Sequence, residues 1–121
     1  CSISILDIHA NGKPFGGYTV YNMAKAAHQM MVQSLAIELA PDIRVNGIAP
    51  GINILPIEGT EQALTAGTIE KICHAVPLKR IGTPQDIAQV AVFLAAAPYI
   101  TGQIIAVDGG RGLTLAGNES K

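Results

Sequence analysis

Short apolar segments alternate with longer helix-like segments along this chain, and this alternation constrains the fold more than any other feature. The apolar segments span residues 2–7, 43–49 and 103–107. Each is short enough for a buried strand, and the intervening segments are long enough for crossover helices. Strands separated by helices pair in parallel, with helices covering both faces of the sheet. The sequence therefore predicts an α/β fold with a doubly wound, Rossmann-like parallel sheet.

The intervening segments predict three helices. The first, over residues 19–40, is apolar around much of its circumference, as expected for a helix buried on two sides. The second, over residues 61–75, is weakened by Gly67 and by several β-branched residues. The third, over residues 83–97, has the clearest start. Its first residues, Thr83-Pro84-Gln85-Asp86, provide a cap, a proline in the first turn and an acidic side chain that can return to the exposed amides.

The composition and net charge exclude several classes of protein. The chain has 121 residues, of which 49% are hydrophobic, which is more apolar surface than so short a chain can bury. Part of that surface is expected to face a partner, another subunit or a further part of the same protein. The net charge of −1 and the lack of a basic cluster argue against a nucleic-acid partner. No apolar run approaches 18 residues and no signal-peptide pattern is present, so neither membrane insertion nor secretion is predicted.

Two cysteines and three histidines offer little site chemistry by spacing. Cys1 and Cys73 form no disulfide framework and no Cys-x-x-Cys, which favours free thiols in a cytoplasmic protein. The histidines are scattered and lack partners at metal-ligand spacing, so no metal site is predicted. Because the chain starts at Cys1 without a methionine, we expect it to be a fragment.

Tyr21 and Lys25 form the main chemical signal. A spacing of four residues places a phenol and an ammonium on one face of the first predicted helix. A nearby ammonium favours phenolate, so Lys25 is expected to lower the pKa of Tyr21 and to suit it for proton transfer. Such a pair also occurs by accident on many solvated helices. Tyr18 is a rival donor, but Asn22 rather than a lysine follows it at the same spacing.

Two further motifs follow the Tyr21-x-x-x-Lys25 pair. Arg44-Val45-Asn46-Gly47-Ile48-Ala49-Pro50-Gly51 comes after the first helix, and Tyr99-Ile100-Thr101-Gly102-Gln103 precedes Val107-Asp108-Gly109-Gly110 near the end. In this order they resemble the C-terminal half of a short-chain dehydrogenase/reductase. The resemblance implies a domain over residues 1–115 that lacks the family's Gly-rich cofactor-binding half. It is followed by a flexible, polar tail over residues 116–121.

The resemblance also implies a cofactor site. Tyr21 matches the residue that exchanges a proton opposite a hydride moving to or from nicotinamide, and Lys25 matches the residue that holds the nicotinamide ribose. Pro50 and Gly51 match the turn that passes the nicotinamide, and Asn53 follows where a side chain can still donate to the cofactor. NADPH is the expected cofactor. The residues that distinguish it from NADH belong to the half that is absent.

Asp7 stands where most family members have serine. A carboxylate is a poor neighbour for a developing alkoxide but suits a ring nitrogen that is protonated as C=N is reduced. Asp7 and the run from Pro50 to Pro56, Pro-Gly-x-x-x-Leu-Pro, together make the chain resemble the pteridine reductases, which include dihydromonapterin and dihydrofolate reductases. The resemblance implies that Asp7 and Tyr21 contact the substrate and that Leu55 and Pro56 belong to an apolar lid over a pterin.

Three alternatives qualify these assignments. Asp7 lies fourteen residues before Tyr21 instead of the family's thirteen, so in a shifted register Ile8 would face the substrate. Asp7 could instead be a turn residue before Gly12. The Asn46 amide could form hydrogen bonds with polar backbone groups near the site, or equally with backbone groups of the sheet.

The implied function is NADPH-dependent reduction of a pterin or dihydrofolate by the complete enzyme, a cytoplasmic homotetramer. One alternative is a carbonyl reductase of the same family, of the 3-oxoacyl or sugar-alcohol type. The other is a noncatalytic, truncated paralogue that acts only as an assembly partner.

Overall fold

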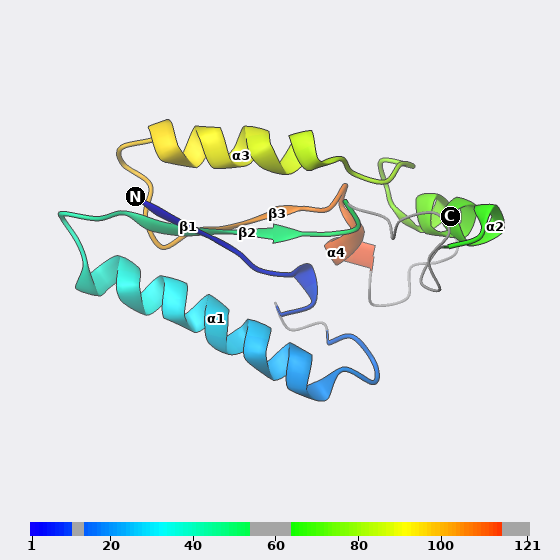
Figure 1. Cartoon of the computed structure of the whole chain (residues 1–121), viewed down its shortest axis with the longest axis horizontal. Helices are drawn as coiled ribbons and strands as arrows, with labels where there is room; N and C mark the ends of the chain where they lie inside the picture. Colours follow the sequence, from blue (N-terminus) through cyan, green and yellow to red (C-terminus); the bar gives the residue numbers. More distant parts are fainter. Residues whose placement is uncertain (11–13, 54–63, 115–121) are drawn as a thin grey trace.

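A three-stranded parallel sheet forms the centre of the protein. The computed structural model describes residues 1–10, 14–53 and 64–114. The strands are β1 (Ser2–Ile5), β2 (Val45–Pro50) and β3 (Ile104–Val107), in the order β1-β2-β3. Both strand pairs are parallel, as Figure 1 shows. The predicted α/β class and parallel sheet are confirmed.

Helices cover the two faces of this sheet. α1 (Thr19–Glu38) lies on one face and α3 (Pro84–Ala96) on the other (Figure 1). α2 (Ala66–Ala75) lies beyond the carboxyl end of the strands. Two short elements complete the described part of the chain, the 3-10 helix η1 (Ile8–Ala10) and the single-turn helix α4 (Arg111–Thr114).

Some predicted boundaries differ from those in the structure. The first strand ends before Leu6, because the chain turns there toward η1, an element that was not predicted. α2 starts at Ala66, since the Thr65 side chain accepts a hydrogen bond from the Thr68 N–H and caps the helix. The single turn of α4 was not predicted. The predicted tail over residues 116–121 lies outside the described residues.

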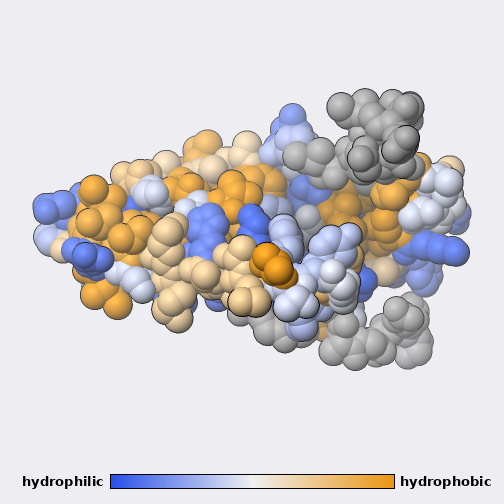
Figure 2. All heavy atoms as spheres, turned by 60° about the horizontal axis from the view of Figure 1, so that its bottom comes forward, coloured by the Kyte–Doolittle hydropathy of each residue, from blue (hydrophilic) through white to orange (hydrophobic). Residues whose placement is uncertain are grey.

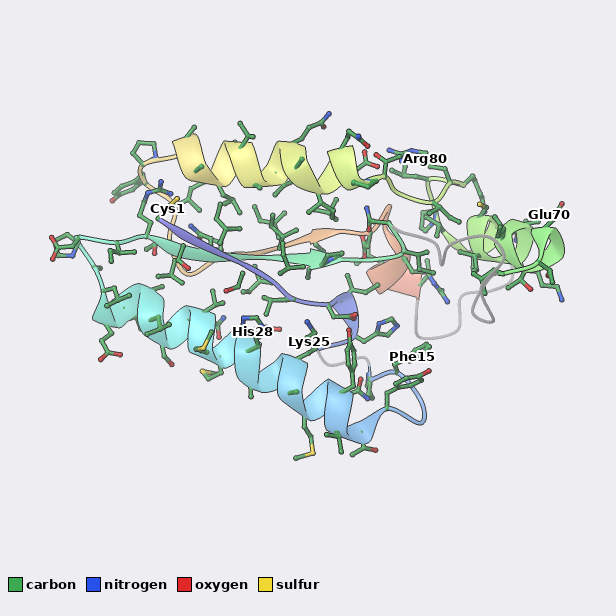
Figure 3. The ribbon with its side chains drawn as sticks, in the orientation of Figure 1. Cys1, Phe15, Lys25, His28, Glu70 and Arg80 are labelled. Carbon is green, nitrogen blue, oxygen red and sulfur yellow. The ribbon has the colours of Figure 1, made fainter. Side chains whose placement is uncertain are left out.

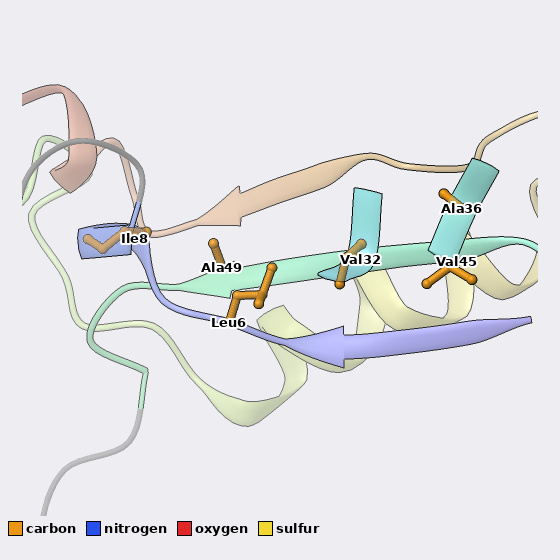
Figure 4. Close-up of a cluster of buried hydrophobic side chains, with 6 residues drawn as sticks. All are labelled: Leu6, Ile8, Val32, Ala36, Val45 and Ala49. Atoms are coloured by element: carbon orange, nitrogen blue, oxygen red, sulfur yellow. The ribbon is translucent and has the colours of Figure 1, made fainter. Parts of the chain in front are cut away.

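Apolar side chains from α1 pack onto the sheet around β2. Figure 4 shows this cluster, in which α1 contacts β2 and the segment that leaves β1; its buried members are Leu6, Ile8, Val32, Ala36, Val45 and Ala49. On the opposite face Ile48 and Leu94 are fully buried between β2 and α3. β2 is therefore buried on both faces, which is typical of the central strand of a parallel sheet.

At the amino ends of β2 and β3, three side chains tie β2 to α3 and to the segment that leads into β3. We refer to Arg44, Asn46 and Thr101 as the amino-end clasp. The Arg44 guanidinium donates to the carbonyl oxygens of Leu94 and Ala95 at 2.7 and 2.8 Å. These carbonyls belong to the last turn of α3, where a cation satisfies acceptors that have no partner within the helix.

The other members of the clasp bond to the backbone that leads into β3. Asn46, which is fully buried, donates to the Ile100 carbonyl at 2.9 Å and accepts from the Gln103 N–H at 3.0 Å. The Thr101 hydroxyl accepts from the Val45 N–H at 3.1 Å. Of the two alternatives for Asn46, the structure therefore favours the one in which its amide satisfies the ladder of the sheet.

Candidate active site

The predicted site residues gather at the carboxyl ends of the three strands. Asp7 follows β1, Pro50 and Gly51 end β2, and Asp108 follows β3. α1 also begins at this edge and runs back along the sheet (Figure 1). In an α/β sheet, ligands bind outside the carboxyl ends of the strands, so this edge is the expected location for chemistry.

Asp7, Tyr21 and Lys25 lie together at this edge. The Tyr21 hydroxyl donates a hydrogen bond of 2.7 Å to Asp7 Oδ2. Lys25 lies one turn further along α1, on the side that faces the sheet (Figure 3). Its Nζ donates to the Ile5 carbonyl at 3.5 Å and lies 5.8 Å from the centroid of the Tyr21 ring. The three predicted catalytic residues thus form one cluster.

The structure shows which of Asp7 and Ile8 contacts Tyr21. Asp7, and not Ile8, reaches Tyr21, while Ile8 is only 6% exposed and belongs to the core. Asp7 Oδ1 also accepts from the His9 backbone N–H at 2.8 Å, which closes a short turn. The turn role and the contact with Tyr21 therefore coexist in one carboxylate.

The hydrogen bond between Asp7 and Tyr21 sets the acid–base properties of both groups. Burial would raise the pKa of Asp7, but hydrogen bonds from the His9 backbone, the Tyr21 hydroxyl and the His9 ring outweigh it, so the pKa of Asp7 is lowered. Partial burial, with the hydrogen bond to Asp7 and its negative charge, raises the pKa of Tyr21 to about 12. The expected lowering of the Tyr21 pKa by Lys25 is therefore wrong for this structure, because burial raises the pKa and because the carboxylate, not the ammonium, is in direct contact with the hydroxyl.

His9 is a member of the site that the sequence analysis missed. Its ring Nδ1 lies 2.8 Å from Asp7 Oδ1. The ring also packs against Phe15, which packs against Tyr18, with centroid separations of 4.8 and 4.7 Å. The Asp-x-His spacing was a possible signal for the first contact. The aromatic contacts depend on the path of the loop before α1, which the sequence does not specify.

Gly51 and Asn53 contact other parts of the same edge. The Gly51 N–H donates to the Val107 carbonyl at 3.0 Å, and a Cβ at Gly51 would lie 2.7 Å from Asp108 Cβ. The glycine thus allows close approach of the segment after β3. Asn53 is 8% exposed, and its Oδ1 has no hydrogen-bond partner among the described residues. The predicted lid residues Leu55 and Pro56 lie outside the described residues.

Two cavities open at this edge, and Asp108 lines both. One, of about 480 Å³, is bordered by Asn53 and by the segment between α2 and α3. The other, of about 350 Å³, has mostly apolar walls and is bordered by Ile8, the neighbour of Asp7, and by Leu113 of α4. Both volumes are of the size that a small heterocyclic ligand needs.

Neither a metal-binding group of side chains nor a membrane-spanning helix is found in the part of the chain that the structure describes. Within ranges 1–10, 14–53 and 64–114, no three His, Cys, Asp or Glu side chains are grouped so that they could hold a metal ion. In the same ranges, no helix combines the length and apolar character that crossing a membrane requires.

Comparison with known proteins gives consistent matches. Residues 1–111 match the family described as enoyl-(acyl carrier protein) reductase. The chain is 41% identical over 108 residues to pteridine reductase 1 from Leishmania tarentolae, covering 86% of this chain and 36% of that protein. It is 42% identical over 101 residues to carbonyl reductase family member 4 from Danio rerio, covering 82% and 40% respectively.

A solved structure is also similar to this chain. A protein from Burkholderia xenovorans, assigned to the short-chain dehydrogenases/reductases, superposes with a TM-score of 0.74 at 36% identity. The match covers 92% of this chain and 41% of that one. The chain therefore spans about two fifths of the length of the proteins that it matches.

Proposed function

The chain belongs to the short-chain dehydrogenase/reductase family, and from this premise we propose that the complete protein reduces a pterin or dihydrofolate with NADPH. The observation that carries the proposal is the 2.7 Å hydrogen bond between Tyr21 and Asp7, with Lys25 alongside. This arrangement combines a proton donor with a carboxylate at the end of a parallel strand. The similarity to pteridine reductase 1 supports the same substrate class.

The residues present fit a nicotinamide cofactor. Asn53 Oδ1 is a buried acceptor without a donor among the described residues, so it suits an amide N–H such as that of a carboxamide. The Lys25 ammonium has three donors, and its one long hydrogen bond leaves capacity for ribose hydroxyls. Lys25, Pro50, Gly51 and Asn53 would hold NADPH, which supplies the hydride when bound.

The chemistry assigned to this chain is proton delivery. Asp7 is ionised at neutral pH, because its pKa is lowered, so it acts as a negative charge and not as the acid. A negative charge stabilises a ring nitrogen that becomes protonated while C=N is reduced. Tyr21 donates its hydroxyl proton to that nitrogen, and the adjacent ring carbon receives the hydride.

Carbonyl reduction is the second candidate, and the similarity to carbonyl reductase family member 4 favours it. In that reaction negative charge develops on the substrate oxygen. Asp7 would then repel the developing charge instead of stabilising it. On electrostatic grounds this structure suits an imine-like substrate better.

The test is NADPH oxidation by the complete protein with dihydrobiopterin, dihydrofolate and a 3-oxoacyl substrate. We expect turnover with a pterin or folate, and we expect Tyr21→Phe to lower kcat by about 10²- to 10⁴-fold, the usual contribution of a general acid. The matched control is Tyr18→Phe, which removes a hydroxyl three residues away. Full activity of Tyr21→Phe would overturn the role of Tyr21, and turnover of the 3-oxoacyl substrate alone would favour the second candidate.

A further inference from the structure

The Asp7 carboxylate is shared between a phenol and an imidazole. Tyr21 donates to Oδ2, whereas the backbone N–H and the ring Nδ1 of His9 both lie 2.8 Å from Oδ1. Each carboxylate oxygen therefore has its own partner residue. Rotation of the carboxyl group is restricted from both sides, which keeps Oδ2 directed at the Tyr21 hydroxyl.

The contact with Asp7 determines which nitrogen of His9 is free. An ionised carboxylate only accepts hydrogen bonds, so Nδ1 carries the hydrogen that faces Asp7 and Nε2 is left without this contact. The His9 side chain is 21% exposed, which keeps it in contact with solvent. Packing against Phe15, at a centroid separation of 4.8 Å, helps to fix the orientation of the ring.

Few charged groups compete with His9 for this carboxylate. α1 is the helix that packs against η1, and with its N-cap residue Tyr18 it contributes Tyr21 and Lys25 to this region. The Lys25 ammonium bonds to a backbone carbonyl. Across the neighbouring cavity, both oxygens of Asp108 accept backbone N–H groups. Among the described residues, His9 is thus the residue in contact with Asp7 that can carry a positive charge.

We propose that His9 is a positioning residue, which orients Asp7 toward Tyr21 and whose charge sets how firmly Asp7 holds the Tyr21 hydroxyl. Histidines change charge between about pH 5 and 8. A protonated His9 balances the negative charge of Asp7, so the carboxylate attracts the phenol proton less strongly and Tyr21 donates more readily. With His9 neutral, Asp7 retains the proton on Tyr21 more strongly. This inference rests on the proposed function.

The first test is His9→Asn in the complete protein. An asparagine amide can donate where Nδ1 does, but it cannot become cationic. We expect kcat to fall about three- to tenfold at pH 6, which corresponds to up to one unit in the acidity of Tyr21, and to stay within about twofold at pH 8.5. KM should change less than about twofold, because His9 acts through Asp7. The control His28→Asn makes the same change at a half-buried histidine of α1 and should keep the wild-type pH profile.

A second measurement does not depend on turnover. In protein labelled with ¹³C at tyrosine Cζ, the Tyr21 signal is assigned by its absence in Tyr21→Phe. We expect its chemical shift to follow a titration step between about pH 5 and 8 in the wild type, and to lose that step in His9→Asn. His28→Asn should retain it.

The outcomes separate the two proposals. A Tyr21 step that His9→Asn abolishes, in a protein without pterin or carbonyl turnover, counts against the proposed function but supports the coupling of His9 to Tyr21. If the protein is active and the ratio of kcat in His9→Asn to kcat in the wild type is the same at pH 6 and pH 8.5, the role of His9 is overturned. An unchanged Tyr21 step in His9→Asn does so as well.

Discussion

The acid strength of Tyr21 depends on which charged group lies nearest to its hydroxyl. Tyr21 and Lys25 share a helix face as the spacing predicts, but the ammonium lies 5.8 Å from the ring centroid. Burial raises the pKa of Tyr21, and Asp7, which accepts a hydrogen bond of 2.7 Å from the hydroxyl, adds to this, so that the pKa reaches about 12. Burial and the adjacent carboxylate therefore together decide the direction of the pKa shift.

Replacing Asp7 tests this explanation. In Asp7→Asn, the negative charge is lost while the shape is kept, so the pKa of Tyr21 should fall from about 12 toward its ordinary value of 10.0. The measurement is an alkaline titration of the Tyr21 Cζ signal. Since the folded-state pKa is the higher one, this bond stabilises the fold below about pH 10 and ceases to do so as the pH rises through about 12.

The control for this prediction is Asp42→Asn, which removes an exposed carboxylate between α1 and β2. It should leave the Tyr21 titration unchanged. A Tyr21 pKa that stays near 12 in Asp7→Asn would show that burial alone causes the shift.

Sequence reasoning predicted part of this cluster. Motif resemblance was sufficient to select Asp7, Tyr21 and Lys25, because their spacing is tied to the strand and the helix that carry them. It did not select His9, whose contact with Asp7 depends on the turn that η1 makes after β1. Local turns of this kind are set by backbone hydrogen bonds that a residue pattern does not reveal.

At the scale of elements, the amino-end clasp joins β2, α3 and the start of β3. Its central member, Asn46, is fully buried and bonds to two backbone groups of different residues. Asn46→Ala would leave the Gln103 N–H without its acceptor. An unsatisfied buried group costs about 1–3 kcal/mol, so we expect the free energy of unfolding, measured by urea denaturation, to fall by about the same amount.

The matched control is Asn22→Ala, because Asn22 also bonds to backbone, at Phe15, but in a solvent-exposed setting. Water can replace those bonds, and the expected loss is below about 1 kcal/mol. Equal losses in the two variants would contradict the role assigned to Asn46.

Elements with strong local signals were predicted well and short ones were not. The capping box of α3 is present as predicted, with Thr83 accepting from the Asp86 N–H and Asp86 accepting from the Thr83 N–H. α4 has one turn and contains Gly112, so its sequence has no helical periodicity to recognise. Its start instead depends on Asp108, which accepts from the N–H groups of Gly110 and Gly112.

At the scale of the whole molecule, many apolar side chains remain uncovered. Figure 2 shows apolar side chains on the surface to which α1 contributes, where Val20 and Ile37 are 80% and 82% exposed. Ile5, on the edge strand β1, is 49% exposed. The proteins that the chain matches are more than twice its length, since it covers 36% and 40% of the two relatives compared. Both facts fit the expectation that this surface faces other protein.

Cofactor binding provides the prediction at this scale. The 121 residues contain no Gly-x-x-x-Gly-x-Gly turn after a strand, the feature that receives a dinucleotide pyrophosphate at a helix amino terminus. We therefore expect the 121-residue chain to bind NADPH at least about a hundredfold more weakly than the complete protein, as measured by titration of NADPH fluorescence.

Equal affinity in the two samples would mean that this chain carries the main cofactor contacts. A complete protein that binds no NADPH, yet forms stable complexes with a longer relative, would instead support the noncatalytic assembly partner. Sedimentation of both samples distinguishes specific assembly from non-specific association of the exposed apolar surface.

The amino-end clasp and the cluster of Asp7, Tyr21 and Lys25 lie at opposite ends of the sheet. Arg44 and Asn46 hold the amino ends, whereas Asp7, Tyr21 and Gly51 lie at the carboxyl ends. Amino-acid changes that alter selectivity can therefore accumulate at one end while the other maintains the fold. For directed evolution, libraries confined to the carboxyl-end loops should retain a larger fraction of folded variants than libraries spread along the strands.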